Sequence, residues 1–243
     1  MENQNKFLVF LNSRLLVGLG IVLAAFIGAY TFYQVRSLDN TLTVTGSTTK
    51  AVTSDHVKWI GVINRVVKAS TLKVGYADMA KDLVFVKDFL KEKNIPESQI
   101  VISPIFMDQN YDQPQGAERS YTLRQNIEIN SGDVNAISEI SKNTQPLIEK
   151  GVIFSTQSLE FTYLKLPLER VSMLSDAVKD AKARAASLAT SSGKNIGQLK
   201  SASSGVVQVM SANSTDVSDY GSYDTSKIDK NIMMTVKATF TLK

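Results

Sequence analysis

The sequence contains one imidazole, His56, and it stands next to a carboxylate, Asp55. Together with a serine hydroxyl, this pair has the residue types of a Ser-His-Asp hydrolase. Consecutive residues of a strand point to opposite faces, however, so Asp55 cannot easily orient His56. The sequence also lacks a G-x-S-x-G segment, which would place a nucleophilic serine on a sharp turn. We therefore expect no catalytic role for His56 and interpret it as the exposed first residue of a strand.

Composition removes several other classes of site. The 243 residues contain no Cys, which excludes disulfide scaffolds, thiol nucleophiles and Cys-ligated zinc or iron–sulfur centres. A single His excludes any metal site that needs two imidazole ligands. We accordingly assign no catalytic, cofactor-binding or metal-binding residue and no cofactor, and we expect the protein not to be an enzyme.

Carboxylates on a predicted long helix are spaced to share one face. Asp176 and Asp180 are four residues apart, and Glu169 precedes them. Such a pair can bind a metal ion or transfer protons, as in a carboxylate-dependent or metal-dependent hydrolase. Basic residues lie close by, as in the pair of Asp180 and Arg184, and this pattern is typical of a solvated helix surface. The hydrolase is therefore the weaker alternative.

A second group of carboxylates punctuates residues 211–230, a polar segment with few apolar residues. The group comprises Asp216, Asp219, Asp224 and Asp229. Calcium ligands occur at closer and more regular spacing around a glycine, so no EF-hand is indicated. Tyr220 and Tyr223 lie among these residues, and tyrosine is favoured in protein contacts. We predict a long exposed loop, flexible or in contact with a partner.

The first element that organises the chain is an apolar segment near the N-terminus. Residues 15–33 (LLVGLGIVLAAFIGAYTFY) carry no charge. A helix of this length, at about 1.5 Å per residue, spans the roughly 30 Å hydrocarbon core of a bilayer. Lys6 and Arg14 precede the segment, and the positive-inside rule places them in the cytoplasm. We predict a cytoplasmic N-terminus over residues 1–14, a transmembrane signal anchor over 15–33, a linker over 34–40 and an α+β domain over 41–243.

This organisation predicts a single-pass protein of the cell membrane, with its main domain periplasmic or extracellular. The alternative is a cleaved signal peptide, whose apolar region measures about 7–15 residues and ends at a small-residue cleavage site. Here the apolar run is longer, and its best small pair, Gly28-Ala29, is preceded by Ile27, which matches the cleavage pattern poorly. We favour the uncleaved anchor, which makes the lipid bilayer a partner of the chain.

Hydrophobic periodicity predicts an α+β fold for the exported part. We predict strands over residues 56–69, 100–108, 121–130 and 152–164, and helices over 71–93 and 134–148. Pro104 indicates an edge or a bulge in the second strand. The order β-α-β-β-α-β is that of the ferredoxin-like arrangement, in which two helices pack on one face of an antiparallel sheet.

A third long helix and C-terminal strands complete the predicted domain. Pro167 begins the helix and Gly193 ends it. Its buried stripe is expected to comprise Leu168, Val171, Leu174, Val178, Ala181, Ala185 and Leu188. A short strand follows over residues 197–210, with a break at 203–205. In the last strand, alternation places Ile232, Met234, Val236, Ala238, Phe240 and Leu242 on one face.

The charge of the chain argues against a nucleic-acid partner. The 27 Lys and Arg residues exceed the 23 Asp and Glu residues by a net charge of only +4. These charges are dispersed, whereas nucleic-acid binding requires a clustered basic face. We therefore expect no nucleic acid among the partners.

Four segments resemble the SIMPL family, also called DUF541. Residues 43–59 are similar to its V-x-G opening strand, with Ser54-Asp55 in the place of the usual Pro-Asp. Residues 91–103 are similar to its L-x-x-x-G-I-x-x-x-D-I segment, although Asn94 replaces the glycine and Gln99 the aspartate. The two remaining segments are residues 180–205, which resemble the family's Ala-rich helix and turn, and residues 230–243, which resemble its last strand.

The resemblance covers the predicted domain and implies a fold and a cellular setting. None of the four segments is a catalytic motif. Members are mostly bacterial envelope proteins, some associated with tolerance of oxidative stress and some forming ring-like oligomers. We therefore expect a non-enzymatic, membrane-anchored envelope protein that forms a homo-oligomer or binds an envelope protein partner. An oxidative-stress response factor is the alternative.

Overall fold

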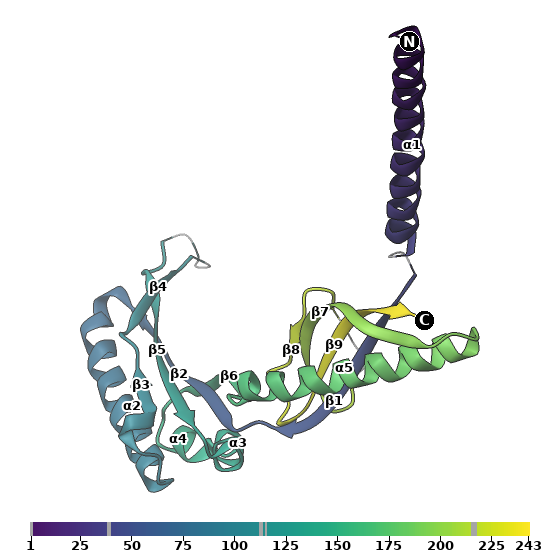
Figure 1. The fold of residues 1–243 in the computed structure, drawn as a ribbon. Helices are drawn as coiled ribbons and strands as arrows, with labels where there is room; N and C mark the ends of the chain where they lie inside the picture. The colour runs from purple at the N-terminus through teal and green to yellow at the C-terminus, as the bar shows by residue number, and fades with distance from the viewer. Residues whose placement is uncertain (1, 38–39, 112–113, 115, 215–217) are drawn as a thin grey trace. The chain divides into compact units, whose positions relative to one another are not determined.

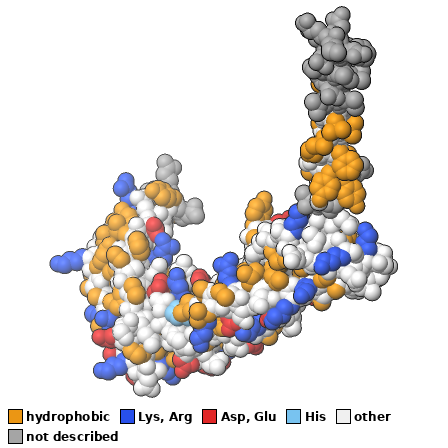
Figure 2. Space-filling model, viewed as in Figure 1, with side chains coloured by type: hydrophobic (Ala, Val, Ile, Leu, Met, Phe, Trp, Pro, Cys, Tyr) orange, Lys and Arg blue, Asp and Glu red, His pale blue; other side chains and the backbone are white. Residues whose placement is uncertain are grey.

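The computed structural model describes residues 2–37, 40–111, 114, 116–214 and 218–243. Its first element is helix α1 (Glu2–Ser37). Within it, residues Val17–Val35 form a segment long and apolar enough to cross a membrane. Figure 2 shows hydrophobic side chains around this segment, and they are exposed, as at Phe26, which is 76% exposed. The predicted apolar helix is therefore present, with the character of a membrane span or of a signal sequence.

The described chain forms two compact units. Unit 1 comprises Met1–Ser47, Asp176–Gly205 and Thr235–Lys243, and unit 2 comprises Thr48–Ser175 and Val206–Met234. Both contain strands and helices, so the predicted α+β class is confirmed. The predicted boundaries, with one domain over residues 41–243, stay a prediction.

The larger sheet lies in unit 2 (Figure 1). Its strands are β2 (His56–Lys68), β3 (Ile100–Ile102), β4 (Phe106–Asn110), β5 (Ser120–Ser131) and β6 (Phe154–Thr162). The order is β3-β5-β2-β6, with β4 also paired to β5, and these pairs are antiparallel. Pro104 separates β3 from β4, since proline cannot donate to a ladder. The ferredoxin-like designation of this segment stays a prediction.

Helices pack on one face of this sheet. They are α2 (Leu72–Glu92), α3 (Val134–Lys142) and α4 (Gln145–Glu149). The core between helices and sheet includes Trp59, whose indole Nε1–H donates to the Thr156 hydroxyl at 3.1 Å. A buried carboxylate, Asp82, ties α2 to β2 through Arg65, whose Nη2 lies 2.7 Å from it.

The single helix predicted over residues 134–148 is wrong in one respect, because it is divided into α3 and α4. The N-terminal cap is as predicted, with Asp133 accepting from the Ala136 N–H at 3.0 Å. Pro146 explains the division, since its ring clashes with a helical carbonyl four residues earlier and it lacks the N–H of a continuing helix. The helix consequently ends at Lys142 and a new one begins at Gln145.

The second sheet is formed by β1 (Thr41–Thr53), β7 (Ile196–Ser211), β8 (Ser222–Tyr223) and β9 (Asp229–Leu242), in the order β1-β9-β7-β8. The predicted alternation of the last strand is confirmed, because Ile232, Met234, Val236, Ala238 and Phe240 are buried, and Leu242 at the end of the strand is half-buried. The break predicted at residues 203–205 is wrong, since β7 is continuous there. Neighbouring strand β8 pairs with β7 in parallel.

Helix α5 (Leu166–Ser191) confirms only part of the predicted stripe, because Ala181 and Ala185 are buried as predicted but the leucines are not. The buried residues are Met173, Ala177, Ala181, Ala185 and Ala189. Of the predicted stripe, Leu168 and Val171 are 76% and 74% exposed, and Leu174 and Leu188 are also exposed. The cause is close packing in unit 1, where a Cβ added to Gly46 would lie 2.3 Å from the Ala177 carbonyl oxygen. At such a separation only small side chains fit between helix and strand.

Candidate functional site

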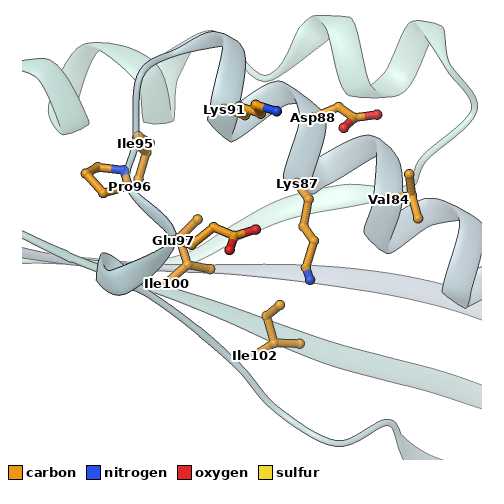
Figure 3. Close-up of a pocket in the computed structure, with 9 residues that line it drawn as sticks. All are labelled: Val84, Lys87, Asp88, Lys91, Ile95, Pro96, Glu97, Ile100 and Ile102. Atoms are coloured by element: carbon orange, nitrogen blue, oxygen red, sulfur yellow. The ribbon is translucent and has the colours of Figure 1, made fainter.

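A groove opens in unit 2 between the C-terminal half of α2 and strand β3. It encloses about 690 Å³ and has an apolar floor with charged residues around it (Figure 3). Its lining residues are Val84, Lys87, Asp88, Lys91, Ile95, Pro96, Glu97, Ile100 and Ile102. The groove therefore combines apolar surface with the outer strand of a sheet.

The chain between α2 and β3 shapes one end of the groove. Asn94 adopts a positive φ of 60°, which ends the helix, because asparagine tolerates this left-handed conformation. The Ile95 N–H then donates to the Leu90 carbonyl at 3.0 Å, and the Ile95 side chain is buried. Pro96 and a short 3-10 turn, Glu97–Gln99, return the chain to the sheet. This Asn94-Ile95-Pro96 segment is the predicted end of the helix.

The β3 edge provides main-chain hydrogen-bonding groups. The Ser103 N–H donates to the Asn126 carbonyl at 3.0 Å, and the same register pairs Val101 with Glu128. Because antiparallel ladders alternate, Ile102 directs its main-chain groups away from β5. The Ile100 carbonyl points away from β5 for the same reason, whereas the Ile100 N–H donates to the main-chain carbonyl of Glu97. The side chains alternate too, so Ile100 and Ile102 line the groove while Val101 is 58% exposed.

Charged side chains surround the apolar floor. Figure 3 shows Lys87 extending from α2 toward Ile102, and the Glu97 carboxylate lies on the opposite side, near Ile100. Among the residues that the structure describes, no ion pair holds the ammonium of Lys87 or Lys91. Lys87 is thus a cation beside an apolar surface, and a carboxylate there would gain a charge-assisted contact.

The structure does not assemble the predicted Ser-His-Asp candidates. His56 begins β2 as predicted, although it is half-buried. The Asp55 N–H donates to the Thr162 carbonyl at 3.1 Å, and its Oδ1 accepts from the Leu164 N–H at 2.7 Å. Asp55 is therefore bound to backbone that follows β6, and it does not orient the imidazole.

The carboxylates of α5 each have a partner of their own. Asp176 pairs with Lys179 at 2.9 Å. Asp180 accepts from the Ser47 N–H at 2.8 Å and from Arg184 at 2.7 Å. The hydrogen bond from Ser47 is the main cause that lowers the pKa of Asp180, and Arg184 adds to it. These carboxylates are thus held as charged surface groups.

Glu169 is likewise held by a cation. Its pKa is lowered mainly by the hydrogen bond from Lys50, whose Nζ lies 2.5 Å from the carboxylate. Tyr163 donates to the same carboxylate at 3.3 Å, and burial raises the pKa of this tyrosine. Within the described ranges, no cluster of three or more Asp, Glu or His side chains could hold a metal ion.

The described part of residues 211–230 is exposed in places as predicted, for example at Tyr220, which is 97% exposed, but it also contains strand β8 and a buried lysine. Asp216 lies outside the described residues. Asp229 contacts the Thr53 hydroxyl at 3.1 Å, whereas Asp224 accepts from the Ser226 N–H at 2.7 Å. Burial raises the pKa of Asp224, but hydrogen bonds from Ser226 and Lys227 outweigh it and lower the pKa overall. Asp224 and Asp229 therefore have separate partners and do not form a common site.

Lys230, at the end of this segment, has a fully buried side chain. Its Nζ donates to the carbonyls of Asp224 and Lys227 at 2.5 Å and 2.7 Å. The Tyr223 ring lies 5.9 Å away, and the Asp224 carboxylate 3.9 Å away. Burial lowers the pKa of Lys230, and the Asp224 charge opposes this effect. The ammonium thus organises the segment that the sequence presents as an unstructured polar stretch.

Sequence reasoning missed the groove because none of its residues belongs to a catalytic motif. One signal was Val84, an apolar residue of α2 that lies outside the buried stripe of this helix. The structure leaves its side chain 55% exposed. The other was the edge strand that Pro104 indicates.

Comparison with models of protein families places the chain in a family. The model of the family described as "SIMPL: Protein of unknown function (DUF541)" matches residues 42–240. No curated protein matches the chain. The family match extends from β1 into β9 and includes the elements that form the groove.

Proposed function

Since the chain belongs to the SIMPL family, whose function is unknown, we propose that it is a non-enzymatic membrane-anchored envelope protein that binds other proteins through its exported domain. The bound protein is a second copy of the chain or another envelope protein. Helix α1 supports the anchoring, because Val17–Val35 is long and apolar enough to cross a bilayer.

The groove beside β3 is the observation that carries the binding role. It joins an apolar floor to an outer strand and an ammonium group, and these are features of a binding surface. By contrast, the carboxylates that the hydrolase alternative requires are engaged one by one by Lys179, Arg184 and Lys50. The geometry therefore favours binding over acid–base chemistry.

Photo-crosslinking in the membrane tests this proposal. A photoreactive amino acid replaces Val84 in the groove, and in a matched control it replaces Val74 of the same helix. The two valines are 55% and 59% exposed, but only Val84 lines the groove. We expect discrete adducts from position 84 in irradiated cells and none from position 74.

The mass of each adduct identifies its partner. An adduct of twice the chain mass would show self-association, and another mass would show a second envelope protein. Equal crosslinking from positions 74 and 84, or none from position 84, would contradict a binding role for the groove.

A further inference from the structure

We infer that the groove binds an extended peptide segment of a partner protein, which adds as a strand to the open edge of β3. The segment carries apolar side chains at alternate positions and an acidic side chain opposite Lys87. This inference rests on the proposed binding function and specifies the chemistry of the partner.

The main chain of β3 selects an extended peptide over other apolar ligands. The Ile102 N–H and C=O and the Ile100 C=O face the open side of the strand, as the β3–β5 register requires. An edge of this kind is satisfied by the backbone of another strand. A lipid chain or a small apolar molecule would fill the floor but would leave these groups without matching donors and acceptors.

The floor of the groove sets the pattern of side chains in the bound peptide. Ile100 and Ile102 both face the groove, together with Val84 and the buried Ile95. Alternate side chains of an added strand lie about 7 Å apart on one face. Apolar residues at every second position would therefore contact this floor, and the residues between them would face solvent.

The charges define the register of the peptide. Lys87 reaches over the Ile102 end, whereas Glu97 lies at the Ile100 end (Figure 3). An acidic side chain of the peptide is attracted to the Ile102 end by Lys87 and repelled from the Ile100 end by Glu97. Asp88 and Lys91 also line the groove. They lie on adjacent turns of α2 and carry opposite charges. Lys87 is the lining cation that extends toward Ile102, so we place the acidic side chain of the peptide opposite it.

Selection from random ten-residue peptides displayed on phage tests the inference, with the full chain in detergent micelles as the target. We expect enrichment of sequences with alternating Val, Ile or Leu and one Asp or Glu. The enriched peptides are then synthesised, and their affinities are measured by fluorescence polarisation.

Two pairs of variants locate the binding. Val84→Arg fills the groove and should weaken binding at least tenfold, whereas Val74→Arg, at a similarly exposed position, should leave it unchanged. Lys87→Glu should exchange the preferred acidic residue for a basic one, and Lys73→Glu on the same helix should not. All four positions are exposed, so thermal melting should match that of the parent chain.

Backbone methylation tests the added strand directly. Two peptides are made, one N-methylated at the odd-numbered amides and the other at the even-numbered amides. Methylation of the set that faces β3 should abolish binding, whereas methylation of the other set should have little effect. The inference would be overturned if no peptides are enriched or if the Val84 and Val74 variants have equal effects. It would also be overturned if methylation of the odd-numbered amides and methylation of the even-numbered amides are both tolerated.

The two proposals fail in different ways. Adducts from position 84 in cells without strand-like peptide binding would leave the binding role standing and remove the added strand. Strand-like peptide binding without adducts in cells would support the chemistry of the groove and count against the proposed function.

Discussion

At the scale of single residues, the contact of Gly46 with α5 shows why small side chains recur in this chain. A Cβ at Gly46 would lie 2.3 Å from the Ala177 carbonyl oxygen and 2.4 Å from the Ala181 amide nitrogen. Both are backbone atoms of a helix and cannot move away separately. The V-x-G opening and the Ala-rich helix, which the sequence presents as two separate segments, are therefore two sides of one contact.

We predict that Gly46→Ala destabilises the protein by about 3 kcal/mol, because overpacking against backbone has no inexpensive relaxation. Thermal or urea unfolding of the full chain measures the change. Gly132→Ala is the matched control, since a Cβ there meets its nearest described neighbour at 3.7 Å. A Gly46→Ala variant as stable as Gly132→Ala would show that the helix and strand can separate.

Asp180 provides a pH-dependent prediction. Its pKa is lowered in the folded chain, mainly by the Ser47 N–H, so its stabilising contribution is present above the unfolded value of about 3.9 and is lost as the pH falls through the folded value. We expect Asp180→Asn to unfold more readily than the parent at pH 7. The difference should close in acid, and a difference that is constant from pH 7 to pH 3 would contradict this account.

At the scale of elements, the segment before β9 shows how one buried group can order a polar stretch. Lys230 donates hydrogen bonds to the carbonyls of Asp224 and Lys227, and the backbone around these carbonyls shields its ammonium from water. These hydrogen bonds add to the apolar contact that Ile228 makes with the core of unit 2.

We predict that Lys230→Met destabilises the protein by about 1–3 kcal/mol, since the carbonyls of Asp224 and Lys227 lose their donor. The folded pKa of Lys230 is lowered, so the unfolded chain binds more protons between that value and about 10.4. The parent should therefore gain stability relative to Lys230→Met as the pH rises through that interval. Denaturant unfolding at a series of pH values measures both effects.

Lys227→Met is the control for this change, because its side chain is exposed and its carbonyl is retained. A similar loss in both variants would show that the loop depends on general polarity. A gap that narrows with rising pH would contradict the sign of the Lys230 shift.

At the scale of the whole molecule, the distribution of the chain across a membrane is the property to establish. The sequence contains no Cys, so single cysteines can be introduced as unique labels. We predict that Ser204→Cys reacts with a membrane-impermeant maleimide in intact spheroplasts of a bacterial host. Ser13→Cys should react only after lysis, because the predicted orientation places it in the cytoplasm.

The reverse labelling pattern would contradict the predicted orientation. Loss of the Ser13→Cys signal even after lysis, together with a shorter mature chain, would indicate a cleaved signal peptide instead of an anchor. Retention in the membrane after alkaline extraction would support the anchor.

Local patterns in the sequence were sufficient for most elements. Helix α2 and strands β5 and β9 follow from periodicity, because each buries one side of a regular amphipathic pattern. Strand β2 follows instead from its β-branched sequence with apolar residues on both faces, where Val62 and Ile63 are both buried. The division between α3 and α4 was also readable from Pro146, although we predicted one helix. The family resemblance, too, is carried by short segments, and the match over residues 42–240 agrees with it.

Long-range contacts decided the remaining features. Periodicity shows that α5 has apolar positions, but it was the approach of Gly46 that selected the alanines over the leucines as the buried stripe. The burial of Lys230 depends on carbonyls that a turn brings to its ammonium. The groove exists because pairing with β5 holds β3 beside the end of α2. Sequence alone thus determined which segments are regular and apolar, whereas tertiary structure decided which faces they bury and which stay available for binding, because burial depends on neighbours distant in the chain.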